Sequence, residues 1–400
     1  MKKGWEIKKL SEVATIFNGN SINAKVKETK YTNIEIGLPF IATKDVSFES
    51  VLDYDNGVKI PFKEKNNFKI ASENTVLICA EGGSAGRKIG FTNQEVCFGN
   101  KLFASIPKNG LVSKYAYYYY FSSAFQKNFT SELAGIIGGV SMAKFKQIEI
   151  PLPPIPEQKR IVSKLDQTFA AIAKAKANAE QNLKNTKKLF ESYLQGMFEK
   201  KGVDWEELTL KEVSEEFSRG KSKHRPRGDK SILGGEYPLI QTGDISNAEH
   251  WLNFYSNTYN EKGLAQSKLW SKGTICIAIV GANVAETAIL NFDACFPDSV
   301  IGIVVNSKKA NNEYVEYLLQ SFKAYLKEKG KGTARDNINM ATFQYQKFPF
   351  PNVKEQQSIA KKLNTLSAET KRLEAIYQKK IKDLEELKKS ILQKAFNGEL

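Results

Sequence analysis

The side chains in this sequence best able to do chemistry are basic residues on loops. Residues 219–230, RGKSKHRPRGDK, hold six Lys or Arg in twelve positions, and the prolines and glycines among them predict a loop. Such a loop could be a solvated turn, but its charge favours contact with phosphate groups. A glycine-rich run, EGGSAGRK at 81–88, ends in a second basic pair. The formal net charge of +15 agrees with a polyanionic partner.

The sequence offers little material for catalysis. It contains neither the phosphate loop GxxxxGK[ST] nor the dinucleotide loop GxGxxG. The run at 81–88 comes closest to a catalytic loop, but its glycines more simply provide tight backbone geometry. His224 and His250 are too few for a histidine-based triad or metal cluster. The four cysteines, at 79, 97, 276 and 295, are too widely spaced for a CxxC zinc pair and are predicted to be reduced, buried thiols. We therefore expect a protein that binds without catalysing.

Self-similarity extends over the whole chain, which indicates an internal repeat. The stretch PLPPIPEQKRIVSKL (151–165) returns as PFPNVKEQQSIAKKL (349–363), with seven of fifteen positions identical at an offset of 198. WEIKKLSEV from Trp5 returns as WEELTLKEV from Trp205, and LPFIATKDV returns as YPLIQTGDI. A unit of about 200 residues is therefore present twice, and each copy is predicted to be a globular part of ~150 residues followed by a helix of ~40.

Short β-rich runs such as 76–80 and 274–280 lie between Gly and Asn turns, which predicts a mixed α/β (α+β) fold. The run YAYYYYFSSAF at 115–125 resembles a base-stacking platform, but the helical spacing of its tyrosines favours a packed helix. The predicted domains and spacers are 1–155, a first globular domain; 156–200, a first long helix; 201–352, a second globular domain; and 353–400, a second long helix.

The prolines at 151, 153, 154 and 156 end the first globular domain in extended chain. Apolar positions after each junction repeat at spacings of 3 and 4, which predicts an antiparallel coiled coil between the two helices of one chain. The expected packing positions are Leu165, Ile172, Leu189 and Tyr193 in the first helix and Leu363, Leu366, Leu373, Tyr377, Leu384, Leu387 and Ile391 in the second. About 40 helical residues make a spacer of ~60 Å.

These features resemble the specificity (S) subunits of type I restriction-modification enzymes. The residues that carry the resemblance are the two Trp-centred segments, the TKD and TGD segments, the PLPPIPEQ and PFPNVKEQ junctions and the ending FNGEL. The second junction has Asn352 and Lys354 where the first has prolines. The resemblance implies two similar target recognition domains separated by two long antiparallel helices, an internal pseudo-two-fold repeat, and recognition of a split site in double-stranded DNA.

The resemblance also implies partners. Two methyltransferase subunits, which methylate adenine N6 with S-adenosylmethionine, would dock on the helices. Two restriction subunits, which use ATP and Mg, would then join them. This chain itself would carry no catalytic residue, cofactor or metal. Lys and Arg would grip phosphates, and Arg, Asn and Gln would read base edges. The candidate DNA-contacting residues are Arg87, Lys88, Lys144, Arg219, Lys221, Lys223, Arg225, Arg227, Asn283, Arg335 and Asn337.

Three alternatives remain open: a stand-alone bipartite DNA-binding regulator, a structural coiled-coil adaptor, and a methyltransferase in its own right. The start of the sequence lacks the apolar run of a signal peptide. Nothing in it approaches the ~20 apolar residues needed to span a bilayer. We therefore expect a soluble cytoplasmic protein with no membrane contact.

Overall fold

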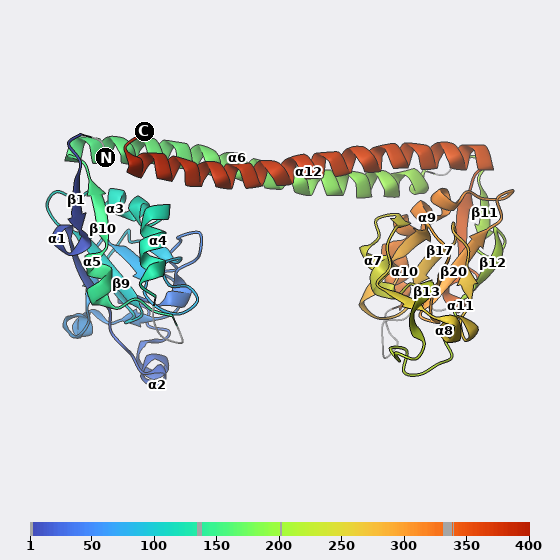
Figure 1. The fold of residues 1–400 in the computed structure, drawn as a ribbon, viewed down its shortest axis with the longest axis horizontal. Coiled ribbons are helices and arrows are strands. Elements are labelled where there is room, and N and C mark those ends of the chain that lie inside the picture. Colours follow the sequence, from blue (N-terminus) through green and yellow to red (C-terminus); the bar gives the residue numbers. More distant parts are fainter. Residues whose placement is uncertain (1–2, 134–137, 201, 331–337, 339) are drawn as a thin grey trace. The chain divides into compact units, whose positions relative to one another are not determined.

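A computed structural model describes residues 3–133, 138–200, 202–330, 338 and 340–400. The chain divides into two compact units, Met1–Glu180 with Lys379–Leu400 and Gln181–Gln378. Each unit combines one globular part with portions of both long helices, α6 (Ile155–Glu199) and α12 (Val353–Asn397), of 45 residues each (Figure 1). In the part of the chain that the structure describes, we find no helix with the length and apolar character required to cross a bilayer.

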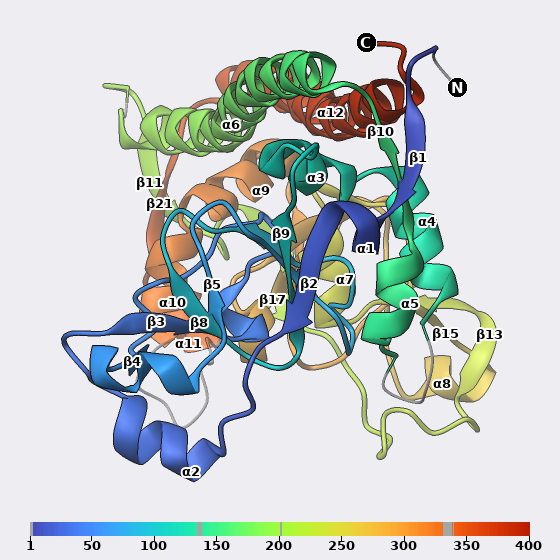
Figure 2. The same ribbon diagram turned by 90° about the vertical axis from the view of Figure 1, so that its left-hand side faces the viewer.

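The first unit is built from short strands, several of them fully buried (Figure 2). Its sheets have the orders β2-β9-β6-β7 and β4-β3-β8-β5, with a ribbon β1-β10. The strands are β1 (Glu6–Lys9), β2 (Ala14–Asn18), β3 (Leu38–Ile41), β4 (Lys59–Ile60), β5 (Ile70–Ala71), β6 (Val76–Cys79), β7 (Ile89–Phe91), β8 (Val96–Phe98), β9 (Leu102–Pro107) and β10 (Glu149–Leu152). Both faces of β6 are covered, which explains why its sequence, VLIC, is continuously apolar.

The second unit repeats these sheets in the same order, with one added edge strand. Its sheets are β12-β20-β17-β18-β14 and β15-β13-β19-β16, with a ribbon β11-β21. The strands are β11 (Glu206–Thr209), β12 (Ser214–Arg219), β13 (Leu233–Leu239), β14 (Trp251–Leu252), β15 (Asn257–Tyr259), β16 (Leu269–Trp270), β17 (Ile275–Ala278), β18 (Thr287–Leu290), β19 (Ala294–Cys295), β20 (Val300–Val305) and β21 (Lys347–Phe350). The mixed α/β fold and its internal repeat, both predicted from the sequence, are confirmed.

Short helices cover the sheets of each unit. In the first they are α1 (Leu10–Val13), α2 (Ala24–Val26), α3 (Ser113–Tyr119), α4 (Ser123–Ser131) and α5 (Met142–Gln147); in the second they are α7 (Thr242–Asn247), α8 (Glu261–Ala265), α9 (Asn312–Ser321), α10 (Lys323–Gly330) and α11 (Met340–Gln344). The tyrosine run forms α3, and Tyr115, Tyr118 and Tyr119 are buried in the core. These tyrosines therefore pack in the hydrophobic core, as their helical spacing predicted.

A buried glutamine joins each globular part to its long helix. Gln158 accepts a hydrogen bond from the Val112 backbone N–H (2.8 Å) and donates to the carbonyls of Gly110 and Pro153 (2.8 Å each). In the second unit Gln356 bonds to Asn311, Lys309 and Pro351 in the same way. Both glutamines are fully buried. The repeated EQ pair of the sequence thus includes the side chain that fixes where the domain ends and the helix begins.

Within each unit the two long helices run antiparallel. In the first unit Arg160 Nη2 donates to the Leu400 carbonyl (2.5 Å) and Lys176 pairs with Glu385 (2.7 Å), so residue numbers rise along one helix as they fall along the other. The end of α12 also enters the core of the first unit, where Leu392, Ala395 and Phe396 are buried. The end of α6 does the same in the second unit with Leu194 and Phe198.

The buried positions of the helices differ in part from the predicted packing positions. Leu165, Ile172 and Leu363 are buried, and Leu366, Tyr377, Leu384 and Ile391 are half-buried. Four others are largely exposed, at 58 % for Leu189, 42 % for Tyr193, 39 % for Leu373 and 46 % for Leu387. These four are more exposed than the other predicted packing positions, and their packing role stays a prediction. An antiparallel pair of helices buries only a narrow row of side chains. On α6 this row includes Ala179 and Thr186. Apolar spacing alone therefore predicts more buried positions than the helices have.

Candidate nucleic-acid interface

The basic loop between β12 and β13 is held in shape by its own polar groups. Gln266 Oε1 accepts hydrogen bonds from the backbone N–H groups of Lys223 (2.6 Å) and His224 (3.0 Å). The His224 ring bonds to Asp229 at 2.8 Å. The Ser231 backbone N–H and this ring lower the pKa of Asp229 to about 2, so the carboxylate stays charged at neutral pH. These hydrogen bonds therefore fix the backbone that carries the Lys and Arg side chains of the loop.

Two of the predicted DNA-contacting residues form ion pairs with an aspartate of the same chain. Arg225 Nη2 lies 3.5 Å from Asp298 Oδ2, and Arg227 Nη2 donates to Asp298 Oδ1. Arg225 also donates to the Ser222 and His224 carbonyls (2.6 and 2.8 Å). These guanidinium groups close the loop onto the segment before β20, which reduces the charge that they can offer to phosphates.

Arg219, Lys221 and Lys223 form the free part of this loop. All three are exposed. Among the residues that the structure describes, none of the three side chains has a hydrogen-bond or ion-pair partner. Because exposed, unpaired cations attract phosphate groups without a competing internal anion, these three fit a phosphate contact best.

In the first unit the predicted pair Arg87 and Lys88 lies against an exposed aromatic ring. The Arg87 guanidinium carbon and the Lys88 ammonium each lie 5.2 Å from the centre of the Phe48 ring, which is 54 % exposed. Arg87 donates to the Gly83 carbonyl (2.5 Å) and Lys88 to the Thr43 carbonyl (3.1 Å). Cations around an accessible ring can grip a nucleic-acid backbone and stack a base. The role of Phe48 could not be predicted from its local sequence, because its partners are about 40 residues away along the chain.

The glycines before this pair are structural. Gly82, Ser84 and Gly86 have the GxSxG spacing of a nucleophile elbow. An elbow leads from a strand into a helix, whereas this turn leads from β6 into β7. Gly86 has a φ of +69°, and a Cβ there would lie 2.6 Å from a Phe129 ring atom. The glycines thus supply tight backbone geometry, as the sequence indicated.

The other predicted contacts lie apart from these clusters. Lys144, on α5, pairs with Glu132 at 2.8 Å. Asn283 ends the short 3-10 helix Gly281–Asn283 and is half-buried. Arg335 and Asn337 lie outside the described residues. The structure therefore brings together Arg87 with Lys88, and the 219–227 residues with one another.

A pocket of about 520 Å³ lies next to the basic loop and was not predicted. Arg227, Gln241, Asn257 and Ser299 supply polar groups, and Leu239 and Tyr259 are among its apolar lining. The strand β13 places Leu239 directly across from Asn257 of β15. Aligning the two repeats singles out Gln241 of this pocket, which replaces Ala42 of the first repeat.

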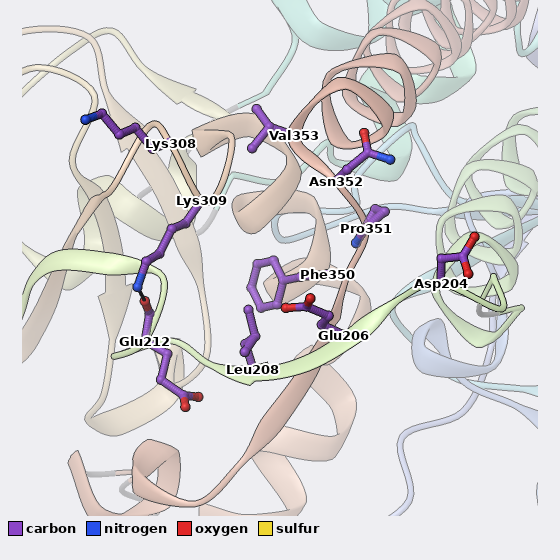
Figure 3. Close-up of a pocket in the computed structure, with 10 residues that line it drawn as sticks. All are labelled: Asp204, Glu206, Leu208, Glu212, Lys308, Lys309, Phe350, Pro351, Asn352 and Val353. Atoms are coloured by element: carbon purple, nitrogen blue, oxygen red, sulfur yellow. Dashed lines mark hydrogen bonds between the residues drawn. The ribbon is translucent and has the colours of Figure 1, made fainter.

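A second pocket has mixed charge. It lies beside β11, β21 and the start of α12 (Figure 3). Its volume is about 600 Å³. Asp204, Glu206 and Glu212 share its lining with Lys308 and Lys309. Lys309 Nζ donates to the Glu212 backbone carbonyl (2.9 Å). Three carboxylates would repel a DNA backbone, so this pocket does not extend the basic surface.

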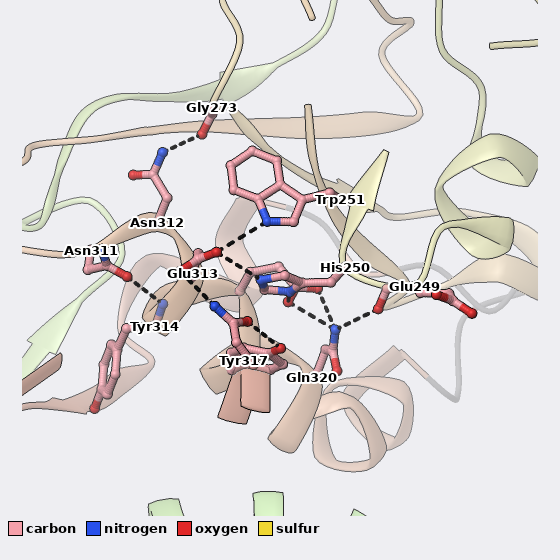
Figure 4. Close-up of polar contacts among 12 residues, drawn as sticks. Glu249, His250, Trp251, Gly273, Asn311, Asn312, Glu313, Tyr314, Tyr317 and Gln320 are labelled. Carbon is pink, nitrogen blue, oxygen red and sulfur yellow. Dashed lines mark hydrogen bonds and ion pairs between the residues drawn. The ribbon is translucent and has the colours of Figure 1, made fainter. Parts of the chain in front are cut away.

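Both histidines have structural partners. The His250 ring stacks on the Tyr317 ring (Figure 4), with the ring centres 4.2 Å apart. Its Nδ1 lies 2.5 Å from Glu316 Oε2. The Tyr317 hydroxyl donates to Asn364 of α12 (2.8 Å). In the first unit Tyr118 and Lys114 bond to Asp166 of α6 in the same way. These contacts tie each domain to a long helix.

The cysteines are buried thiols, with no metal-binding group of His, Cys, Asp or Glu found among the described residues. Burial raises the pKa of Cys97 to about 11 and raises the pKa of Cys276 as well. A thiol rather than a thiolate is therefore present at neutral pH, which agrees with a core role.

A family model described as a type I restriction modification DNA specificity domain matches residues 2–184 and again residues 202–384. The chain belongs to this family. Specificity subunits of type I restriction systems are non-catalytic and recognise DNA sequence.

Relatives match the chain along its whole length. The StySPI specificity subunit of Salmonella potsdam is 23% identical over 100% of this chain and 90% of the relative. The EcoKI specificity subunit of Escherichia coli K12 is 24% identical with the same coverage. The putative MjaX specificity subunit of Methanocaldococcus jannaschii is 26% identical over 99% of this chain and 93% of the relative.

Solved structures agree on the fold. A chain from a study of complex assembly and conformational transition in a type I restriction-modification system has a TM-score of 0.78 at 18% identity, covering 100% of this chain and 99% of that chain. The HsdS subunit from Thermoanaerobacter tengcongensis has a TM-score of 0.64 at 18% identity, covering 100% and 98%. The repeated mixed α/β fold with long helices is thus the fold of specificity subunits.

Proposed function

We propose that this specificity subunit recognises a bipartite DNA site and docks two adenine-N6 methyltransferase subunits, and through them restriction subunits. Each globular domain, 1–155 and 201–352, would read one half-site. The helices 156–200 and 353–400 would set the gap between the half-sites. Such a protein would act on chromosomal DNA in the cytoplasm. S-adenosylmethionine, ATP and Mg would belong to the partner subunits.

The DNA-binding part of the proposal is supported by the exposed basic groups. In the second domain Arg219, Lys221 and Lys223 would contact phosphates, with Arg225 and Arg227 shaping the loop. In the first domain Arg87 and Lys88 would do so beside Phe48. Phosphate contacts position a protein on DNA without reading its sequence, so groups that reach base edges must supply specificity.

The docking part rests chiefly on one repeated feature of the helix surface. Leu189 in the second unit and Leu387 in the first are equivalent residues, 198 positions apart, and are 58 % and 46 % exposed. Tyr193, Leu373 and Ile376 add further exposed apolar surface. A contiguous exposed apolar patch marks a protein interface, whereas single exposed apolar side chains are ordinary. Since the same leucine is presented once in each unit, two copies of one partner fit this surface better than a single copy.

The test is to co-express the chain with a methyltransferase subunit encoded beside it, measure the mass of the complex, and map N6-methyladenine in the host DNA at single-molecule level. We expect two methyltransferase subunits per specificity subunit and methylation at a split motif. A chain that binds DNA alone, with no dependent methylation, would contradict the proposal and favour a stand-alone regulator.

A further inference from the structure

The pocket beside the basic loop has the composition of a base-reading site. Its lining includes the buried side chains of Leu239 and Tyr259. The Leu239 methyl groups and the Tyr259 ring give it apolar surface. Around them lie the polar side chains Gln241, Asn257 and Ser299. A small number of polar groups above an apolar surface is typical of a site that orients a flat ligand.

The polar groups of the pocket are free to bond outward. Ser299 is only 7% exposed, and its hydroxyl has no hydrogen-bond partner among the described residues. Gln241 is exposed and Asn257 is half-buried, and neither amide side chain has a hydrogen-bond partner among the described residues. Both amides can therefore bond to a ligand that enters the pocket. The pocket is therefore prepared for a ligand that offers donors and acceptors.

The two repeats share the backbone here but differ in the side chains. The Gln241 backbone N–H donates to Asp244 (2.8 Å), and the equivalent Ala42 N–H donates to Asp45 at the same distance. Asn257 lies across from Leu239, as Val58 lies beside Phe40 in the first unit through a 2.9 Å backbone bond. One scaffold thus carries two amides in the second domain and two apolar residues in the first. This difference is expected where two domains read different sequences.

The charge around the pocket suits DNA. Arg227 lines it, and the same loop carries the exposed Arg219, Lys221 and Lys223. These cations can hold phosphates on either side of a base whose edge faces the pocket. Asn and Gln amides match adenine, since one amide accepts from N6 and donates to N7 in the major groove.

We propose that Gln241 and Asn257 form the adenine-reading pair of the second target recognition domain. This inference rests on the proposed function of the protein as the specificity subunit of a methyltransferase complex. Gln241 or Asn257 bonds the N6 and N7 edge of one adenine, and the other amide, with Ser299, fixes its orientation. The first domain, with Ala42 and Val58 at these positions, reads its half-site by other residues.

The test uses the complete complex of this chain with its methyltransferase subunits. The variants Gln241→Ala and Asn257→Val copy the first repeat, so each introduces a residue that the same backbone already accommodates. Gln167→Ala, which removes an exposed amide from α6, is the matched control. Methylated motifs are mapped genome-wide for each variant, and methylation rates are measured on duplexes carrying each base at every position of both half-sites.

We expect each pocket variant to lose selectivity at one adenine of one half-site. Discrimination there should fall about tenfold or more, the contribution of a good bidentate contact. The other half-site and the control should be unchanged. A uniform loss of methylation with an unaltered motif, or a motif read as before at the normal rate, would overturn the proposal. Absence of methylation by the unaltered complex would instead reject the proposed function itself.

Discussion

The Phe396 ring packs edge-on against Tyr115, with ring centres 5.2 Å apart at 60°. Phe198 and Tyr314 form the equivalent pair in the second unit, at 5.4 Å and 63°. In each pair the tyrosine belongs to a globular domain, and the phenylalanine belongs to the helix that follows the other domain in the sequence. The core of each domain is therefore completed by the opposite repeat.

Replacing Phe396 by Ala should destabilise the first unit by about 3–5 kcal/mol, because it leaves a cavity among buried rings. Phe198→Ala should affect the second unit to a similar extent. Hydrogen exchange of β6 and β17 amides reports on the two units separately. Leu387→Ala, at an exposed position of α12, should change neither. Equal loss of protection in both units after a single substitution would contradict this assignment.

Replacing Gln158 by Ala should weaken the junction between the first domain and α6. The change leaves the Val112 N–H and two carbonyls unpaired in a buried place, at a cost of about 1–3 kcal/mol for each unsatisfied group. Hydrogen exchange of the β6 amides, which lie in the same core, would measure the effect. The exposed Gln167→Ala is the control on the same helix. A stability equal to that of the control would show that the buried amide has no such role.

Replacing Arg219, Lys221 and Lys223 together by Ala should weaken DNA binding and flatten its salt dependence. Each phosphate that the protein no longer neutralises reduces the slope of log K against log salt by about 0.9, so removing all three cations reduces it by nearly 3. Titrations of the complex with DNA at several salt concentrations would measure the slope. Replacing Arg225 and Arg227 should flatten it less, since both guanidinium groups already pair with Asp298. An unchanged slope in the triple variant would remove this loop from the interface.

Inserting seven residues into both long helices should lengthen the recognised gap by about 3 base pairs. Seven helical residues add ~10 Å, and DNA rises ~3.4 Å per base pair. A seven-residue insertion also keeps the packing face of each helix nearly in register. Motif mapping on the variant complex would detect the new gap. Methylation at the original spacing would disprove the role of the helices as spacers.

The sequence predicted the features that depend on local pattern or on repetition. The helix start after the Pro151 region, the buried tyrosines of α3 and the repeated fold all follow from spacing within one segment or from similarity between the two halves. The pairing of Arg225 and Arg227 with Asp298 could not be predicted, because the partners are about 70 residues apart. The same holds for the ring of Phe48 beside Lys88. Apolar spacing placed Leu189 and Leu387 on the long helices. It could not show whether these side chains pack against the other helix or face solvent.

The burial of Phe396 has a consequence for biosynthesis. The ribosome makes the first globular domain early, yet Leu392, Ala395 and Phe396, which belong to its core, are made only after the whole second domain. At about 5–20 residues per second, translation of the ~240 residues between the first domain and Leu392 takes roughly 12–48 s. During that interval the Tyr115 face is uncovered and open to a neighbouring nascent chain.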